Sequence, residues 1–74
     1  MDNKLEAIIR KARDDRPKDW RYGQAIFNYA VMEFPELVNA IRGSNLDPFY
    51  RNDYVEDFLD YLNKMIKANK GYDI

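Results

Sequence analysis

Residues 20–34 read WRYGQAIFNYAVMEF, and this stretch decides the fold. Its apolar residues do not keep to one helical stripe. At helical spacing they cover two faces, the first with Gly23, Phe27, Ala30 and Phe34 and the second with Tyr22, Ile26, Tyr29 and Met32. A helix that is apolar nearly all round is usually enclosed by other elements. We therefore expect residues 20–34 to form the central helix of a small bundle, with Asp19 as its N-cap.

The length and composition set bounds on how such a bundle is held together. A chain of 74 residues forms one domain, residues 1–74, near the lower size limit for a single core. It contains no cysteine and no histidine, which excludes disulfides and removes the favoured ligands of a zinc site. One Trp, six Tyr and four Phe each bury roughly 150–250 Å² when enclosed. Dense helix packing is thus the expected source of stability.

Segments with helical periodicity lie on both sides of the central stretch. Residues 3–12 place their apolar side chains on one stripe, with Asn3 as the expected N-cap. Residues 35–42 begin with a proline suited to a first helical position, and Gly43 follows as a left-handed stop.

The last helix is expected to start at the N-cap Asp53 and to stop near Gly71. The fold class is therefore predicted to be all-α, a compact bundle of about four unequal helices around the central one. The inward positions of three helices predict one core cluster, formed by Phe27, Ala30, Phe34, Leu37, Ile41, Phe58, Leu59 and Leu62.

Composition also argues against several classes of function. Cysteine, histidine and threonine are absent, and the one serine, Ser44, has no histidine to activate it, so we expect no enzyme and no cofactor. Asp53, Asp57 and Asp60 share a helix face, which favours a solvated acidic surface over a metal site. The net charge is −1, and neither a membrane span of roughly 20 apolar residues nor a signal peptide is evident. A cytoplasmic location is the expectation.

The start of the central helix is the first candidate binding site. Trp20, Arg21, Tyr22 and Gln24 surround Gly23 where free backbone N–H groups favour anions. Arginine offers a phosphate fork and the aromatic rings offer stacking faces. The alternative is structural, with both rings in the core and the guanidinium paired with an acid such as Asp47.

The loop at residues 44–52, SNLDPFYRN, is the second candidate. Asp47 is expected to pair with Arg21 or to accept from the amides of a nearby turn, and Pro48 to restrict the loop. The loop would then place Tyr50 and Arg51 beside Trp20 and Tyr22 as one partner-binding rim. Asn28, if buried, is expected to bond a loop backbone. Leu46 and Phe49 are expected to tuck into the core.

The combination Arg21-x-Gly23-Gln24, Phe27-Asn28 and Asp47-Pro48-Phe49-Tyr50 resembles a pattern in short uncharacterised bacterial and phage proteins. The resemblance covers roughly residues 20–62. It implies a small intracellular or phage-encoded protein, working in the host cytoplasm if phage-encoded, and it supplies no catalytic residue or cofactor. It also implies that the RxGQ start and the DPFY loop form one structural unit.

Three functions follow as hypotheses. The first is a non-enzymatic protein-interaction module, in phage a host-directed inhibitor or adaptor, which can dimerise through the last helix because Tyr54, Tyr61 and Met65 widen its apolar stripe. The second is a binder of a small anionic nucleotide-like ligand at residues 20–24. The third is a weak nucleic-acid binder that uses a basic run interrupted by acids, namely Arg10, Lys11, Arg13, Arg16, Lys18 and Arg21.

Overall fold

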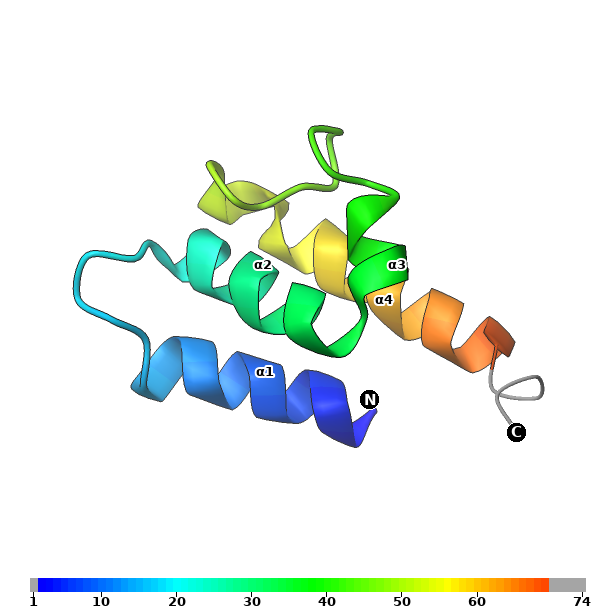
Figure 1. Cartoon of the computed structure of the whole chain (residues 1–74), viewed down its shortest axis with the longest axis horizontal. Coiled ribbons are helices and arrows are strands. Elements are labelled where there is room, and N and C mark those ends of the chain that lie inside the picture. The colour runs from blue at the N-terminus through cyan, green and yellow to red at the C-terminus, as the bar shows by residue number, and fades with distance from the viewer. Residues whose placement is uncertain (1, 70–74) are drawn as a thin grey trace.

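The computed structural model describes residues 2–69. In chain order these residues form α1 (Asn3–Asp14), α2 (Tyr22–Glu33), α3 (Pro35–Asn39), the 3₁₀ turn η1 (Asn52–Tyr54) and α4 (Val55–Asn69) (Figure 1). The expected all-α fold with four unequal helices is confirmed over this part of the chain, which contains no strand. The stop expected at Gly71 lies outside the described residues. No helix within residues 2–69 is long and apolar enough to cross a membrane.

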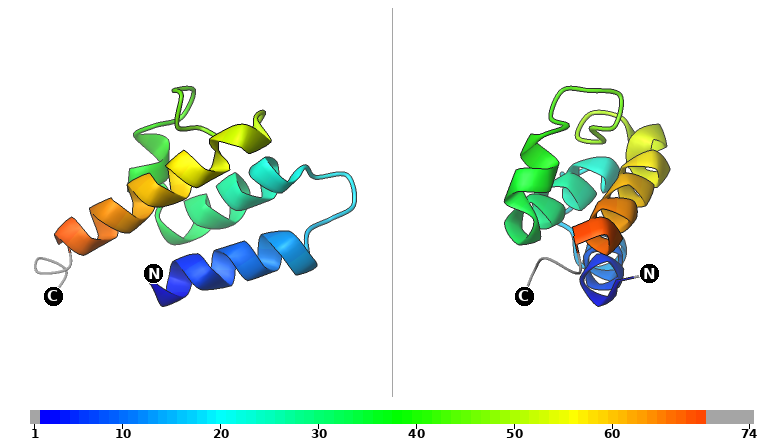
Figure 2. Two further views of the ribbon diagram at one scale, coloured as in Figure 1. Left: turned by 180° about the vertical axis from the view of Figure 1, so that it is seen from behind. Right: turned by 90° about the vertical axis from the view of Figure 1, so that its right-hand side faces the viewer.

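The helix α2 lies in the middle of the bundle, as its all-round apolar pattern predicts. In Figures 1 and 2, α1 runs along one side of α2, while α3 and α4 cover its other sides. The connection between α3 and η1 arches over the end of the bundle that lies away from α1. Five residues of α2 are buried in this arrangement, namely Gly23, Ala25, Ile26, Phe27 and Ala30.

The first helix begins at Asn3, as predicted, but its N-cap lies one residue earlier than expected. The Asp2 carboxylate accepts hydrogen bonds from the backbone N–H of Lys4 at 2.7 Å and of Leu5 at 3.4 Å, so that Asp2 and not Asn3 is the N-cap. At the other end, the Arg16 Nη1 donates to the Ala12 carbonyl at 2.8 Å. A side chain beyond the helix thereby satisfies one of the terminal carbonyls that α1 leaves free.

The expected cap of α2 is wrong as well. The helix starts at Tyr22 after the N-cap Arg21, and Asp19 lies exposed in the connection. A turn closed by the Trp20 N–H on the Pro17 carbonyl, at 3.1 Å, holds Asp19 two residues before the N-cap position. The Gly23 N–H, in the first turn, is bound instead by Asn52 Oδ1 at 2.8 Å from a segment far along the chain.

Two further boundaries differ from the prediction. The helix α3 ends at Asn39 and not at residue 42, because the chain continues in tighter turns such as the one from Ile41 N–H to the Val38 carbonyl. Gly43 has the expected positive φ of 81°. Asp53 does not cap α4, because it lies within η1 with its carboxylate bound by Arg51.

The core is one cluster to which α1, α2, α3 and α4 all contribute. Of the predicted core positions, Phe34 and Leu37 are only partly buried, and the other six are buried. Phe34 is the junction residue between the end of α2 at Glu33 and the start of α3 at Pro35, where the chain changes direction. Leu46 and Phe49 pack partly buried against the cluster, as expected. The buried cluster consists of Leu5, Ile8, Ala12, Ala25, Ile26, Phe27, Ala30, Val38, Ile41, Val55, Phe58, Leu59 and Leu62.

The assignment of the core can be tested by comparing a substitution at Phe27 with one at Met32, an exposed residue of the same helix. The Phe27 ring is 4% exposed, whereas Met32 is 74% exposed. We expect Phe27→Ala to lower the free energy of unfolding by about 3–5 kcal/mol, since it empties the space of a buried ring. Met32→Ala should change it by less than about 0.5 kcal/mol. Chemical denaturation followed by circular dichroism measures both, and equal unfolding midpoints for the two variants would contradict the assignment.

Candidate functional site

The loop between α3 and η1 is fastened to the start of α2 at Gly23. A side chain at this position would collide with the Pro48 carbonyl oxygen and would lie 3.0 Å from Asn52 Oδ1. Pro48 is itself fully buried, and the Asn52 amide oxygen accepts from the Gly23 N–H at 2.8 Å. Glycine is thus required here because another backbone approaches closely.

Asp47 holds the shape of the loop from inside. Its Oδ2 accepts from the Gly43 N–H at 2.7 Å and its Oδ1 accepts from the Phe49 N–H at 2.9 Å. The expected bonding to amides of a nearby turn is confirmed, and the alternative pairing of Asp47 with Arg21 is wrong. The Arg21 Nη2 donates instead to the Phe49 carbonyl at 2.9 Å, which ties the loop to the start of α2 a second time.

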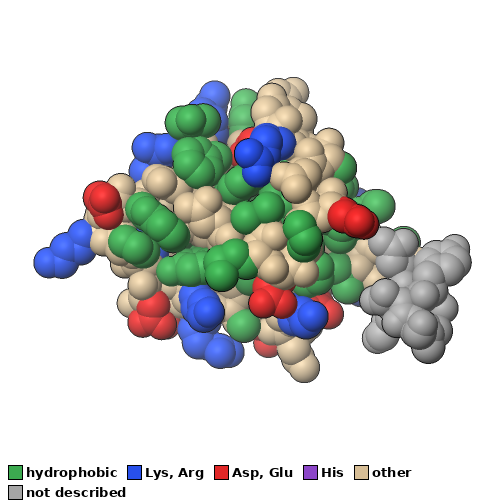
Figure 3. All heavy atoms as spheres, viewed as in Figure 1, with side chains coloured by type: hydrophobic (Ala, Val, Ile, Leu, Met, Phe, Trp, Pro, Cys, Tyr) green, Lys and Arg blue, Asp and Glu red, His purple; other side chains and the backbone are tan. Residues whose placement is uncertain are grey.

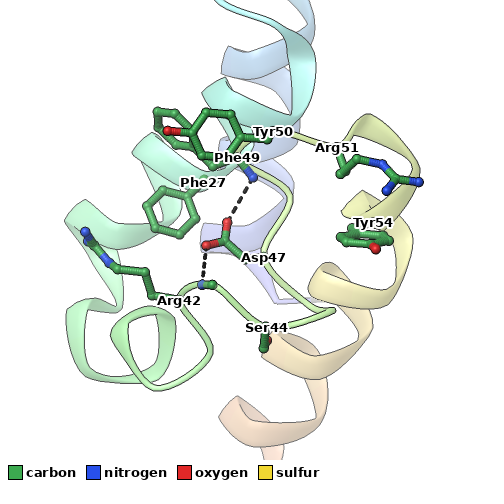
Figure 4. A pocket seen from close by; sticks show the side chains of 9 residues that line it. Phe27, Arg42, Ser44, Asp47, Phe49, Tyr50, Arg51 and Tyr54 are labelled. Carbon is green, nitrogen blue, oxygen red and sulfur yellow. Dashed lines mark hydrogen bonds between the residues drawn. The ribbon is translucent and has the colours of Figure 1, made fainter.

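A cleft of about 420 Å³ opens between α2, the loop and η1 (Figure 4). Figure 4 shows the Asp47 carboxylate in its middle, with Arg42 on one side and Arg51 on the other. We call this space the loop cleft. It is lined by Phe27, Arg42, Gly43, Ser44, Asp47, Phe49, Tyr50, Arg51 and Tyr54.

One wall of the loop cleft is a continuous row of aromatic rings that contact one another edge to face. The Phe27 and Phe49 rings meet edge to face with centroids 5.5 Å apart, and Phe49 meets Tyr50 at 4.8 Å. A guanidinium lies over each end, Arg42 at 5.3 Å from the Phe27 centroid and Arg21 at 5.7 Å from that of Tyr50. Both distances are within the range of cation–π attraction. We call these five residues the arginine-capped aromatic row.

The arginines around the cleft differ in their charge partners. Arg51 binds Asp53 with two hydrogen bonds of 3.0 and 2.7 Å and lies over the Tyr54 ring. The hydrogen bond from Arg51 lowers the pKa of Asp53, so the pair is intact at neutral pH and opens only as the pH falls below the ordinary range of an aspartate. Arg21 and Arg42 have no carboxylate of residues 2–69 within 4.0 Å.

The structure brings part of the predicted site together and separates the rest. Tyr50 and Arg51 line the loop cleft, and Arg21 adjoins it through Tyr50. Trp20 and Tyr22 do not line it, so the expected common rim is wrong. Trp20 packs on Tyr29 with centroids 5.9 Å apart, and Tyr22 lies under the Arg16 guanidinium at 5.7 Å.

The remaining predicted site residues have local roles. Gln24 Oε1 accepts from the Arg21 N–H at 3.4 Å within the first turn of α2. Asn28 is half-buried and has no hydrogen bond to the loop backbone among the described residues; Asn52 supplies the link between α2 and the loop segment. Gly23, Pro48 and Asp47 make the loop contacts described above.

The sequence offered only weak signals for three residues that shape the site. Phe27 was assigned to the core alone, yet its ring also lines the loop cleft. Arg42 stands next to the turn glycine, with nothing in the sequence to mark it as part of a cleft. Asn52 lay at the end of the loop with nothing to mark its bond to Gly23, because that bond spans 29 positions.

The two alternative ligands gain no support from this geometry. At the start of α2, the Gly23 N–H is bound by Asn52, and the Pro48 carbonyl lies directly against Gly23. Within the basic run, Arg13 is already paired with Asp14, and the Arg16 guanidinium donates to the Ala12 and Trp20 carbonyls.

Comparison of the chain with protein-family models, curated proteins and solved structures found no match. The resemblance to short bacterial and phage proteins therefore stays a prediction. Within the described residues, no group of three or more carboxylates is arranged to hold a metal ion. The chemistry of the loop cleft itself must carry the functional argument.

The fastening at Gly23 can be tested by a substitution that ordinarily stabilises helices. Alanine exceeds glycine in helix propensity by about 1 kcal/mol. Here we expect Gly23→Ala to lower the free energy of unfolding by about 1–3 kcal/mol, since the added methyl meets the Pro48 backbone. Urea denaturation measures the change. A stabilised Gly23→Ala variant would contradict the close approach.

Asn52 provides the matching pair of variants. We expect Asn52→Ala to cost about 0.5–2 kcal/mol, as for the loss of a helix cap, because the Gly23 N–H loses its acceptor. Asn52→Asp keeps an acceptor oxygen and adds a negative charge that a helix N-terminus favours. Its unfolding midpoint should remain near that of the wild type. Equal losses in both variants would show that the amide oxygen is not a cap.

Proposed function

We propose that this protein is a non-enzymatic interaction domain that binds another protein through the loop cleft. The observation that carries the proposal is Tyr50. Its side chain is 77% exposed although it continues the row of rings from Phe27 and Phe49, and Arg21 lies over it. Tyrosine and arginine are the residue types over-represented in the energetically dominant positions of protein interfaces.

The proposal draws further support from the rigidity of the loop. The Pro48 carbonyl contacts Gly23, Asp47 binds two loop amides, and Arg21 binds the Phe49 carbonyl. Ordering a loop on binding ordinarily costs free energy, and a surface that is already ordered avoids much of that cost. A well-fixed aromatic surface with an exposed edge suits recognition of a folded or extended partner segment.

The setting that we propose follows from the resemblance. A small cytoplasmic protein of the bacterial or phage kind would use such a surface as an inhibitor or adaptor on a host protein. Homodimerisation through α4 is less favoured, because two of its three expected residues already have contacts within the chain. The Tyr61 hydroxyl donates to the Leu37 carbonyl at 2.9 Å, and Arg51 lies over the Tyr54 ring at 4.8 Å.

Tyr50 and Met32 form a matched pair for testing the proposal. Both are large and exposed, by 77% and 74%, but Met32 lies outside the loop cleft in the groove between α1 and α2. We expect Tyr50→Ala to weaken partner binding by about 2 kcal/mol, or roughly thirtyfold in Kd, as for an interface anchor. Met32→Ala should bind as wild type, and both variants should unfold at nearly the wild-type midpoint.

The measurement uses affinity capture from a bacterial lysate by tagged wild type and both variants, followed by titration of the captured protein by calorimetry. A partner retained by Met32→Ala and lost by Tyr50→Ala supports the proposal. If both variants retain the partner equally, binding occurs outside the loop cleft and the proposal is overturned. The proposal is also overturned if none of the three proteins captures a partner.

A further inference from the structure

We infer that the loop cleft takes an acidic segment of the partner in which a bulky apolar side chain lies between two carboxylates. This inference rests on the proposed function and names the chemistry of the bound segment. Three features carry it. Arg42 in the cleft and Arg21 beside it have no acidic partner among residues 2–69, an apolar wall lies between them, and a carboxylate already occupies the middle of the cleft.

Arg42 and Arg21 mark the two positions at which a carboxylate of the partner would bind favourably. Arg42 and Arg21 lie over the two ends of the arginine-capped aromatic row, and neither has a carboxylate of residues 2–69 within 4.0 Å. Their hydrogen bonds go to neutral oxygens, Asn39 Oδ1 at 3.0 Å and the Phe49 carbonyl at 2.9 Å. A guanidinium that bonds a neutral oxygen keeps further donors for a carboxylate, with which it forms stronger, charge-assisted hydrogen bonds.

The wall between the two arginines favours an apolar group. Phe27, Phe49 and Tyr50 present ring edges and faces to the cleft, and the space of about 420 Å³ admits a large side chain. On the face shown in Figure 3, hydrophobic side chains form a band across the molecule, with both basic and acidic side chains around it. Burying an apolar group against such a wall stabilises the complex by about 25 cal/mol per Å².

The Asp47 carboxylate disfavours ligands that would place a negative charge in the middle of the loop cleft. This carboxylate lies in the middle of the cleft in Figure 4, with both oxygens bound to backbone amides. A phosphate group placed there would meet a like charge at short range, which costs free energy in a partly enclosed site. A basic segment would meet Arg42 and Arg21 instead, whose positive charges no carboxylate of residues 2–69 pairs with. The pattern acid, apolar, acid satisfies all three features.

Arg51 supplies an internal comparison. It lines the same cleft but is already held by Asp53 in two hydrogen bonds. A partner carboxylate would have to displace Asp53 to gain the same contact. The inference therefore assigns the recognition of charge to Arg42 and Arg21, and to Arg51 a role in shaping the cleft.

The probe is a display library of random 12-residue peptides, selected on immobilised wild-type protein. We expect enriched peptides to place Asp or Glu on both sides of Phe, Trp, Leu or Met. Binding of a synthetic enriched peptide should fall at least tenfold when its acids become amides, and similarly on Arg42→Glu, while rising salt weakens it. Arg10→Glu makes the same charge change on α1, outside the cleft, and should bind within about twofold of wild type.

The other outcomes are informative in different ways. Enriched peptides that are basic or uncharged, or equal binding by Arg42→Glu and Arg10→Glu, overturn the inference. ATP that displaces the peptide and binds more tightly assigns the cleft to phosphates and also overturns it. A lysate partner that depends on Tyr50 but whose contact segment lacks acids leaves the proposed function standing and removes the inference alone. A library that yields no Tyr50-dependent peptide counts against the inference too.

Discussion

The structure depends on the approach of the Pro48 carbonyl to Gly23. This contact is possible only where α2 lacks a side chain. The adjacent hydrogen bond from the Gly23 N–H to Asn52 orients the loop relative to the helix. Because Phe49 and Tyr50 follow Pro48 directly, the same contact sets Phe49 against Phe27 and leaves Tyr50 at the surface. Gly23 therefore lowers the intrinsic stability of α2, but its missing side chain lets the loop pack against the helix and form the cleft.

Arginines replace the cross-links that so short a chain lacks. Without disulfides, the connections between helices are held by guanidinium groups that donate to backbone carbonyls and lie over aromatic rings. Arg16 joins the end of α1 to the start of α2, and Arg21 joins the start of α2 to the loop. Each cation–π contact is worth about 0.5–1 kcal/mol at an exposed site. Arg42 lies over Phe27, and within residues 2–69 its guanidinium donates only to nearby Asn39, which leaves it the most available for a partner.

The helices could be predicted from the sequence, whereas much of the site could not. Apolar periodicity located α2 at the centre and the stripes of α1 and α4, because burial acts on every turn of a helix. The cap expected for α2 is wrong because a local rule considers only side chains next to the helix, whereas the Gly23 N–H of α2 is bound by Asn52, far along the chain. The hydrogen bonds of Asp47 to nearby backbone amides could be predicted, because Gly43 and Phe49 lie close to Asp47 in the sequence.

The composition of residues 20–24 suggested an anion site, and the structure uses these residues differently. An arginine and a tyrosine next to a glycine at a helix start can serve a ligand or another segment of the same chain. Here the chain itself occupies the helix start, and Arg21 turns its guanidinium to the far end of the aromatic row. The binding surface that we propose therefore lies on the loop and not at the helix start. The proposed surface exists only in the folded chain, because residues 27 and 50 come from separate elements that Gly23 holds in contact.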